Sequence, residues 1–146
     1  MYDIEKTVGF LLAKAYQRGW ALFKEELDAF EMTPPQFAIM AFLWKQDGMT
    51  QVELSEKSQV DRTTTGGLID RLEKLGMVER QPHPQDRRAN QIRLTPKGKE
   101  MEGPLTEKAK QVTAVFTAGL GQKDHDKLVK MLGILRGERR VYEKPC

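Results

Sequence analysis

The chain of 146 residues is poor in the side chains that most enzymes and metal proteins use. It has one cysteine, Cys146, and two histidines, His83 and His125, which lie far apart. A single cysteine excludes an internal disulfide, and no HExxH, CxxC or glycine-rich phosphate-loop spacing occurs. We therefore expect no catalytic residues, no metal site and no cofactor.

Long apolar runs and targeting segments are also missing. The longest apolar run, residues 37–44, is far shorter than a membrane span, and the first residues, MYDIEK, lack both a basic leader and an apolar signal segment. No repeat, low-complexity tract or linker divides the chain. Together with 39% hydrophobic and 31% charged residues, these absences predict a single cytoplasmic, globular unit over residues 1–146.

The chain does contain basic charge that is concentrated in one segment. Residues 61–100 hold nine Lys or Arg against six Asp or Glu, a surplus equal to the formal net charge of +3 of the whole chain. Local positive charge of this kind is what contact with nucleic acid requires.

A helix is predicted over residues 61–75, where leucines recur at helical spacing. Asp61 is a good N-cap, and Gly76 stands where a helix needs a left-handed terminating residue. The faces not used for packing carry hydroxyl and basic side chains, namely Arg62, Thr63, Thr64, Thr65, Arg71 and Lys74. Such a helix can enter the major groove of DNA, where Thr and Arg reach base edges and phosphates.

A β-hairpin is predicted next, with strands over residues 77–81 and 90–94. Its long polar loop carries Asp86, Arg87 and Arg88, and arginines on a thin loop suit the minor groove. Taken singly, the threonines are equally compatible with a solvated helix start and the arginines with a surface loop. The succession of the two elements favours DNA binding.

The remaining segments are predicted to be helical. Capping and proline patterns start helices at Pro34 and Gln51, the second with Val52 and Leu54 facing inward. A long helix begins at Pro96 and is either kinked at Pro104 or begins in earnest after it. A final helix covers residues 123–139.

The first segment, residues 3–30, is apolar on two faces, so as a helix it must contact two partners. In a small domain one partner is expected to be a second subunit, with burial inside a monomer as the alternative. We predict a homodimer held by the terminal helices through Ile4, Val8, Leu11, Leu128, Leu132 and Leu135.

Residues 33–101 resemble the MarR family of winged helix-turn-helix regulators. The most specific pieces are LIDRLEKLGMVER, the wing motif DRR followed by RLTPKG, and TQVELSEKSQVDRTT before them. The resemblance implies an α+β, mostly α, fold of six helices with a two- to three-stranded wing. Its DNA-binding part would span about 33–100, with helical dimerisation parts at 1–32 and 101–146. Asp86 and Arg88 match the D-x-R wing pattern.

One departure from the family lies in the recognition helix, where Gly66 and Gly67 stand together. The family often has a polar residue in the middle of this helix, so the base preference of other members does not carry over. Each glycine costs the helix roughly 1 kcal/mol relative to alanine. We assign Gly67 to the DNA-facing surface with the threonines.

The function implied is that of a homodimeric repressor that binds a pseudo-palindromic operator on double-stranded DNA. The resemblance also implies a pocket for a small, often aromatic and anionic, effector. Its candidate lining residues are the aromatic set Tyr16, Trp20, Phe37 and Trp44, together with Met40. Core packing is the alternative account of these side chains. The competing function is a protein-interaction or architectural module without sequence-specific operator binding.

Overall fold

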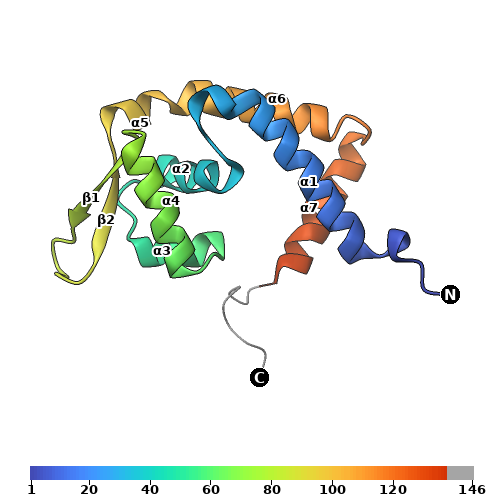
Figure 1. The fold of residues 1–146 in the computed structure, drawn as a ribbon, viewed down its shortest axis with the longest axis horizontal. Coiled ribbons are helices and arrows are strands. Elements are labelled where there is room, and N and C mark those ends of the chain that lie inside the picture. The colour runs from blue at the N-terminus through green and yellow to red at the C-terminus, as the bar shows by residue number, and fades with distance from the viewer. Residues whose placement is uncertain (138–146) are drawn as a thin grey trace.

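A computed structural model describes residues 1–137 (Figure 1). Over these residues the chain is mostly helical, with one two-stranded antiparallel sheet. In chain order the elements are the 3-10 helix η1 (Ile4–Lys6), α1 (Val8–Leu27), the 3-10 helix η2 (Asp28–Phe30), α2 (Pro34–Lys45), α3 (Gln51–Ser58), α4 (Arg62–Lys74), β1 (Val78–Pro82), β2 (Asn90–Leu94), α5 (Pro96–Glu100), α6 (Glu102–Phe116) and α7 (Gln122–Arg136). This is the α+β, mostly helical class that the sequence predicted.

Several helix ends lie where the local sequence signals placed them. Asp61 caps α4, whose end is followed by Gly76 at a φ of +73°. The N–H of Thr33 donates to Gln36 Oε1 (3.0 Å) at the start of α2, and the Thr95 hydroxyl accepts from the Gly98 N–H (3.0 Å) at the start of α5. These contacts are local, so they follow from the sequence directly.

The long helix predicted from residue 96 is two helices, α5 and α6, which meet at Met101. Pro104 causes the break three residues upstream of itself, because its ring cannot tolerate the carbonyl of Glu100 four residues earlier. Pro104 itself is tolerated because it lies in the first turn of α6, where a backbone N–H would have no partner within the helix.

The hairpin pairs Val78 with Leu94 and Pro82 with Asn90. Its first strand begins one residue later than predicted, because the Met77 N–H still donates to Leu72 O (3.0 Å) in the turn that ends α4. A third strand is reduced to a single antiparallel bridge between Thr50 and Gln91.

The hydrophobic core lies where α2, α3, α4 and the hairpin meet the end of α1 and the start of α6. Ile39, Leu43, Leu54 and Ile92 are fully buried there. Val52, which was predicted to face inward, is instead 38% exposed. The reason is that α3 is short and buries only one face, on which Leu54 and not Val52 lies.

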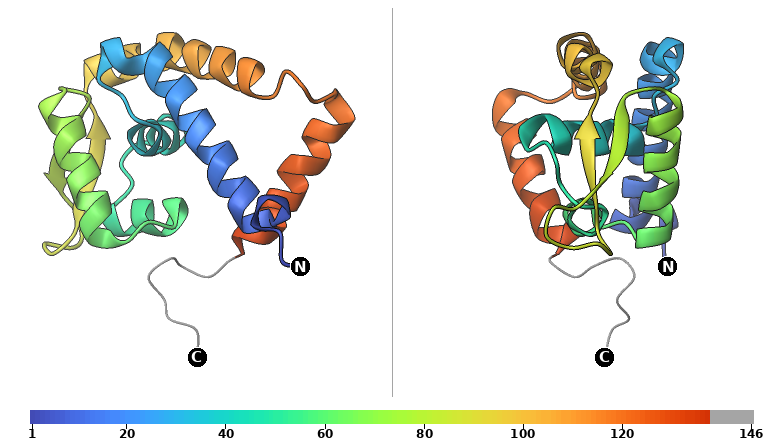
Figure 2. Two further views of the ribbon diagram at one scale, coloured as in Figure 1. Left: turned by 45° about the vertical axis from the view of Figure 1, so that its right-hand side comes forward. Right: turned by 90° about the vertical axis from the view of Figure 1, so that its left-hand side faces the viewer.

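The terminal helices extend away from this core (Figures 1 and 2). Helix α1 packs along α6, where Glu26 pairs with Lys108 (3.7 Å) and Arg18 Nη1 donates to Phe116 O (3.2 Å). No residue of α7 is buried. Among the predicted dimer residues, Leu128 is half-buried and the exposed ones are Ile4, Val8, Leu11, Leu132 and Leu135.

The last helix was predicted to reach residue 139, but α7 ends at Arg136, because Gly137 follows it with a φ of +63°. Cys146 lies outside the described residues. Within residues 1–137, no helix combines the length and apolar character needed to cross a membrane.

Candidate nucleic-acid interface

Helices α3 and α4 are joined by a short turn in which Gln59 adopts a left-handed conformation, with a φ of +56°. This turn points the N-terminus of α4 toward the end of the molecule where the loop between β1 and β2 projects, as both views of Figure 2 show. We call residues 83–89 the wing loop. The two elements predicted to contact DNA therefore lie at the same end.

The N-terminus of α4 is fixed by Asp61 and Thr64. Asp61 Oδ1 accepts from the Thr64 N–H (2.7 Å), and its Oδ2 accepts from the Thr64 hydroxyl (3.0 Å). The backbone hydrogen bond from Thr64, with the hydroxyl second, holds the pKa of Asp61 below its ordinary value. The cap is therefore fully charged at neutral pH, and its stabilising effect is lost only as the pH falls through this lowered pKa.

Thr65 was predicted to contact DNA, and the structure corrects this. The side chain is fully buried, and its hydroxyl donates to Val60 O (3.4 Å). Residues 65, 69 and 72 share the helical spacing of one face, so Thr65 continues the apolar stripe of Ile69 and Leu72 into the core.

The other predicted α4 residues lie on exposed surface. Arg62, Thr63, Gly67 and Lys74 are exposed, and Thr64 is exposed while bonded to Asp61. Arg71 is exposed too, but it pairs with Glu31 (3.4 Å). The free cations of this helix among the described residues are thus at its two ends.

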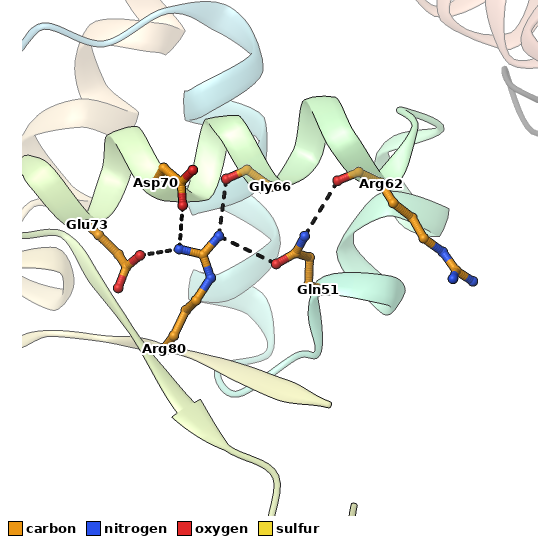
Figure 3. A network of polar contacts seen from close by, with 6 residues as sticks. All are labelled: Gln51, Arg62, Gly66, Asp70, Glu73 and Arg80. Carbon is orange, nitrogen blue, oxygen red and sulfur yellow. Dashed lines mark hydrogen bonds and ion pairs between the residues drawn. The ribbon is translucent and has the colours of Figure 1, made fainter. Parts of the chain in front are cut away.

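Arg80 is a residue of this interface that the sequence reading missed. It extends from β1, and its guanidinium donates to Asp70 Oδ1 (2.6 Å), to Glu73 and to Gly66 O (3.1 Å), all on α4 (Figure 3). It also reaches Gln51 Oε1 on α3 (3.5 Å). One side chain therefore ties the hairpin to both helices.

The paired glycines of α4 have different surroundings. A Cβ at Gly66 would lie 2.9 Å from Gln51 Nε2, whereas a Cβ at Gly67 would meet nothing within 4 Å. Gly66 thus leaves room for the Gln51 side chain in its observed position. Gly67 leaves an exposed stretch of backbone on the outer face of the helix.

The wing loop is shaped by its own backbone. Asp86 Oδ1 accepts from the Arg88 N–H (2.9 Å), and the His83 N–H donates to Ala89 O (3.0 Å) across the base of the loop. Arg87 and Arg88 are exposed. Asp86 therefore orders the turn that presents the two arginines.

Three of the five predicted ligand-pocket residues pack in or against the core. Met40 is fully buried, and Phe37 stacks edge-on with Phe23 and Trp44 at centroid distances of 5.5 and 5.8 Å. The Trp44 indole N–H donates to Gly98 O (2.8 Å). Sequence spacing could not separate these packed rings from rings lining a cavity.

A cavity of about 440 Å³ lies nearby, between α1, α2 and the turn from α3 to α4. Of the predicted pocket residues only Tyr16 lines it, and Trp20 stacks edge-on against Tyr16 at 5.9 Å. Phe42 and Leu68 contribute apolar surface, and Lys57 and Arg136 contribute positive charge. No sequence pattern linked these four residues, which come from four helices.

Comparison with known proteins adds independent observations. The MarR family model matches residues 32–89. The transcriptional repressor NicR of Pseudomonas putida is 31% identical over 135 residues, covering 92% of this chain and 84% of NicR.

Two solved structures share the fold. BpsR of Bordetella bronchiseptica, described as a protein whose DNA binding is regulated by 6-hydroxynicotinic acid, superposes with a TM-score of 0.87 at 28% identity, covering 93% of this chain and 97% of BpsR. A probable transcriptional regulator of Pseudomonas aeruginosa gives a TM-score of 0.87 at 27% identity, covering 91% and 99% of the two chains.

Proposed function

Because the chain belongs to the MarR family of DNA-binding transcriptional regulators, we propose that it is a homodimeric repressor. It acts on DNA in the cytoplasm, where it binds a pseudo-palindromic operator and is released by a small aromatic anion. The observation that carries this proposal is that the N-terminus of α4 and the wing loop present exposed cations at one end of the molecule.

The exposed apolar side chains of α1 and α7 support the dimer. Val8 and Leu11 on α1 and Leu135 on α7 are each at least half-exposed. Apolar surface of this extent on terminal helices is typical of a subunit interface. A two-fold dimer places its two recognition helices on half-sites related by the same symmetry.

Selection from a random duplex pool tests the DNA-binding part of the proposal. We expect the purified protein to enrich a pseudo-palindrome whose half-site centres lie about 10 base pairs apart, one helical turn. Affinity for the enriched duplex should exceed that for random duplex by at least about a thousandfold at physiological salt. Enrichment of no sequence, with binding that depends on salt alone, would instead identify an architectural protein.

The 440 Å³ cavity supports the ligand part of the proposal. Its apolar walls suit an aromatic ring, and the positive side chains of Lys57 and Arg136 suit a carboxylate. The likeness to BpsR, whose DNA binding responds to 6-hydroxynicotinic acid, gives a first probe of this chemical class. The cavity adjoins the turn between α3 and α4, so a ligand there contacts the part of the chain that places the recognition helix.

Titration with 6-hydroxynicotinic acid tests the ligand part. We expect Trp20 emission to change, because Trp20 stacks on Tyr16 at the cavity wall, and operator affinity to fall ten- to a hundredfold, equivalent to about 1.4 to 2.7 kcal/mol of coupling. The Trp44→Phe protein should keep the fluorescence response and the Trp20→Phe protein should lose it. A fluorescence change that comes from Trp44 alone would place the ligand elsewhere. So would an unchanged affinity of the Arg136→Ala protein for 6-hydroxynicotinic acid.

A further inference from the structure

A second cavity, of about 250 Å³, lies where α3 begins, α4 begins and the wing loop returns to β2. Its lining includes Gln51 and Val52 from α3, Arg62 from α4, Arg88 from the end of the wing loop and Asn90 from the start of β2. The two arginines are 26 positions apart in the sequence, and folding brings them to one cavity.

Both guanidinium groups are unpaired within the described residues. The carboxylates nearest in sequence are engaged elsewhere, since Asp61 caps Thr64 and Asp86 accepts from the backbone of Arg88. The other lining side chains carry no charge. The cavity therefore combines two cations with no anion, which suits a phosphate, whose oxygens accept from arginine forks.

The position of the cavity indicates which phosphate it meets. A helix in the major groove and a loop in the adjacent minor groove lie on either side of one sugar-phosphate strand of the duplex. The cavity opens between the N-terminus of α4 and the wing loop, so this strand must pass over it.

We propose that Arg62 and Arg88 together clamp a single backbone phosphate on the strand that separates recognition helix from wing. This proposal rests on the DNA-binding function proposed above and deepens it. It assigns Arg88 to the positioning of the protein on the duplex, in place of the minor-groove contact expected from the sequence. Contacts to phosphate fix register and orientation and carry no base information directly.

The floor of the clamp is held by the Arg80 network. Gln51 lines the cavity, its Oε1 accepts from Arg80, and its Nε2 donates to Arg62 O (3.5 Å) (Figure 3). Figure 3 also shows the Arg62 side chain directed away from this network. The backbone of Arg62 is thus fixed to the hairpin while its guanidinium stays available to DNA.

Phosphate neutralisation in the selected operator tests the shared site. Each duplex in a series carries one uncharged methylphosphonate, at a different position of one half-site in each duplex. The affinity of each duplex is measured for the wild type and for the Arg62→Ala, Arg88→Ala and Arg87→Ala variants. On unmodified operator we expect each of the first two variants to lose about tenfold in affinity, as for one charge-assisted hydrogen bond. At one position of the methylphosphonate both penalties should shrink below about twofold.

Arg87→Ala is the matched control, because Arg87 neighbours Arg88 but does not line the cavity. The affinity loss of Arg87→Ala should stay the same at the methylphosphonate position that removes the losses of Arg62→Ala and Arg88→Ala. Penalties that vanish at two different phosphates would overturn the clamp. The clamp would also be overturned if the affinity loss of Arg88→Ala changed when A·T pairs facing the wing were replaced by G·C pairs, but did not change with a methylphosphonate at any position.

A salt titration on random duplex keeps the clamp testable even if no operator is enriched. One phosphate contact contributes about 0.9 to the slope of log K against log salt. If the arginines share a phosphate, either single variant should lose little of this slope, because the other arginine still neutralises that phosphate, and the double variant should lose about 0.9 per subunit. A loss of about 1.8 per subunit would assign them to separate phosphates and reject the shared site.

Discussion

Replacing Leu132 with glutamate is expected to convert the proposed dimer into a folded monomer and to lower operator affinity at least about a hundredfold, because the second half-site is then no longer held by a linked subunit. Leu132 is exposed on α7, between Leu128 and Leu135 on the same helical face. A carboxylate buried in an apolar interface costs several kcal/mol. The fold itself should persist, because α7 contributes no buried residue to the core.

Sedimentation and circular dichroism check this prediction together. Lys130→Gln is the matched control: it lowers the net charge by the same one unit and lies on the opposite, polar face of α7. That variant should remain dimeric and bind operator normally. A Leu132→Glu protein that stays dimeric at micromolar concentration would exclude this face of α7 from the interface.

Helix ends and the hairpin could be predicted from the sequence because their causes are local. Asp61, Gly76 and Thr95 act on backbone groups within a few residues of themselves. The hairpin follows from two short runs around a polar loop, and the predicted bounds of its first strand differ from the observed ones by one residue. The exposed apolar faces of α1 and α7 were likewise visible as stripes.

The orientation of side chains relative to the tertiary structure could not be predicted in the same way. Thr65 has the chemistry of a DNA contact, yet the rotation of α4 buries it beside Ile69. Phe37 and Trp44 have the chemistry of a ligand site, yet they pack against each other. In each case the residue type permits both roles, and only the packing of neighbouring elements decides.

Close contacts between segments that are distant in the sequence could not be predicted either. A Cβ at Gly98 would lie 2.1 Å from the Met77 carbonyl oxygen, so the glycine of the RLTPKG motif is required by the contact between α5 and the start of the hairpin. The same applies to Arg80, whose partners Gln51 and Gly66 lie 29 and 14 positions away. Neither relation leaves a periodic pattern in the sequence.

Replacing Arg80 with methionine is expected to lower the free energy of unfolding by about 2 kcal/mol, the typical loss for hydrogen bonds to charged groups. Methionine keeps most of the side-chain volume but removes every donor. Asp70 and Glu73 would then face each other without their shared cation, and Gly66 O would lose its side-chain donor. We expect operator affinity to fall as well, since α4 and the hairpin are no longer tied together.

Arg71→Met is the control for the loss of an arginine from the same part of the fold. Arg71 makes one ion pair, with Glu31, and its side chain is 47% exposed, against 23% for Arg80. Such exposed pairs contribute only about 0.2 to 1 kcal/mol. Chemical denaturation of both variants should therefore separate them clearly.

Charge neutralisation distinguishes the cause of the Arg80 effect. If repulsion between the two carboxylates contributes, adding Asp70→Asn and Glu73→Gln to Arg80→Met should restore part of the lost stability. The same pair of changes in the presence of Arg80 should be destabilising, because the guanidinium then loses its anionic partners. Equal unfolding free energies for Arg80→Met and Arg71→Met would mean that the network does not hold the hairpin to α4, and the floor of the proposed phosphate clamp would then lack its support.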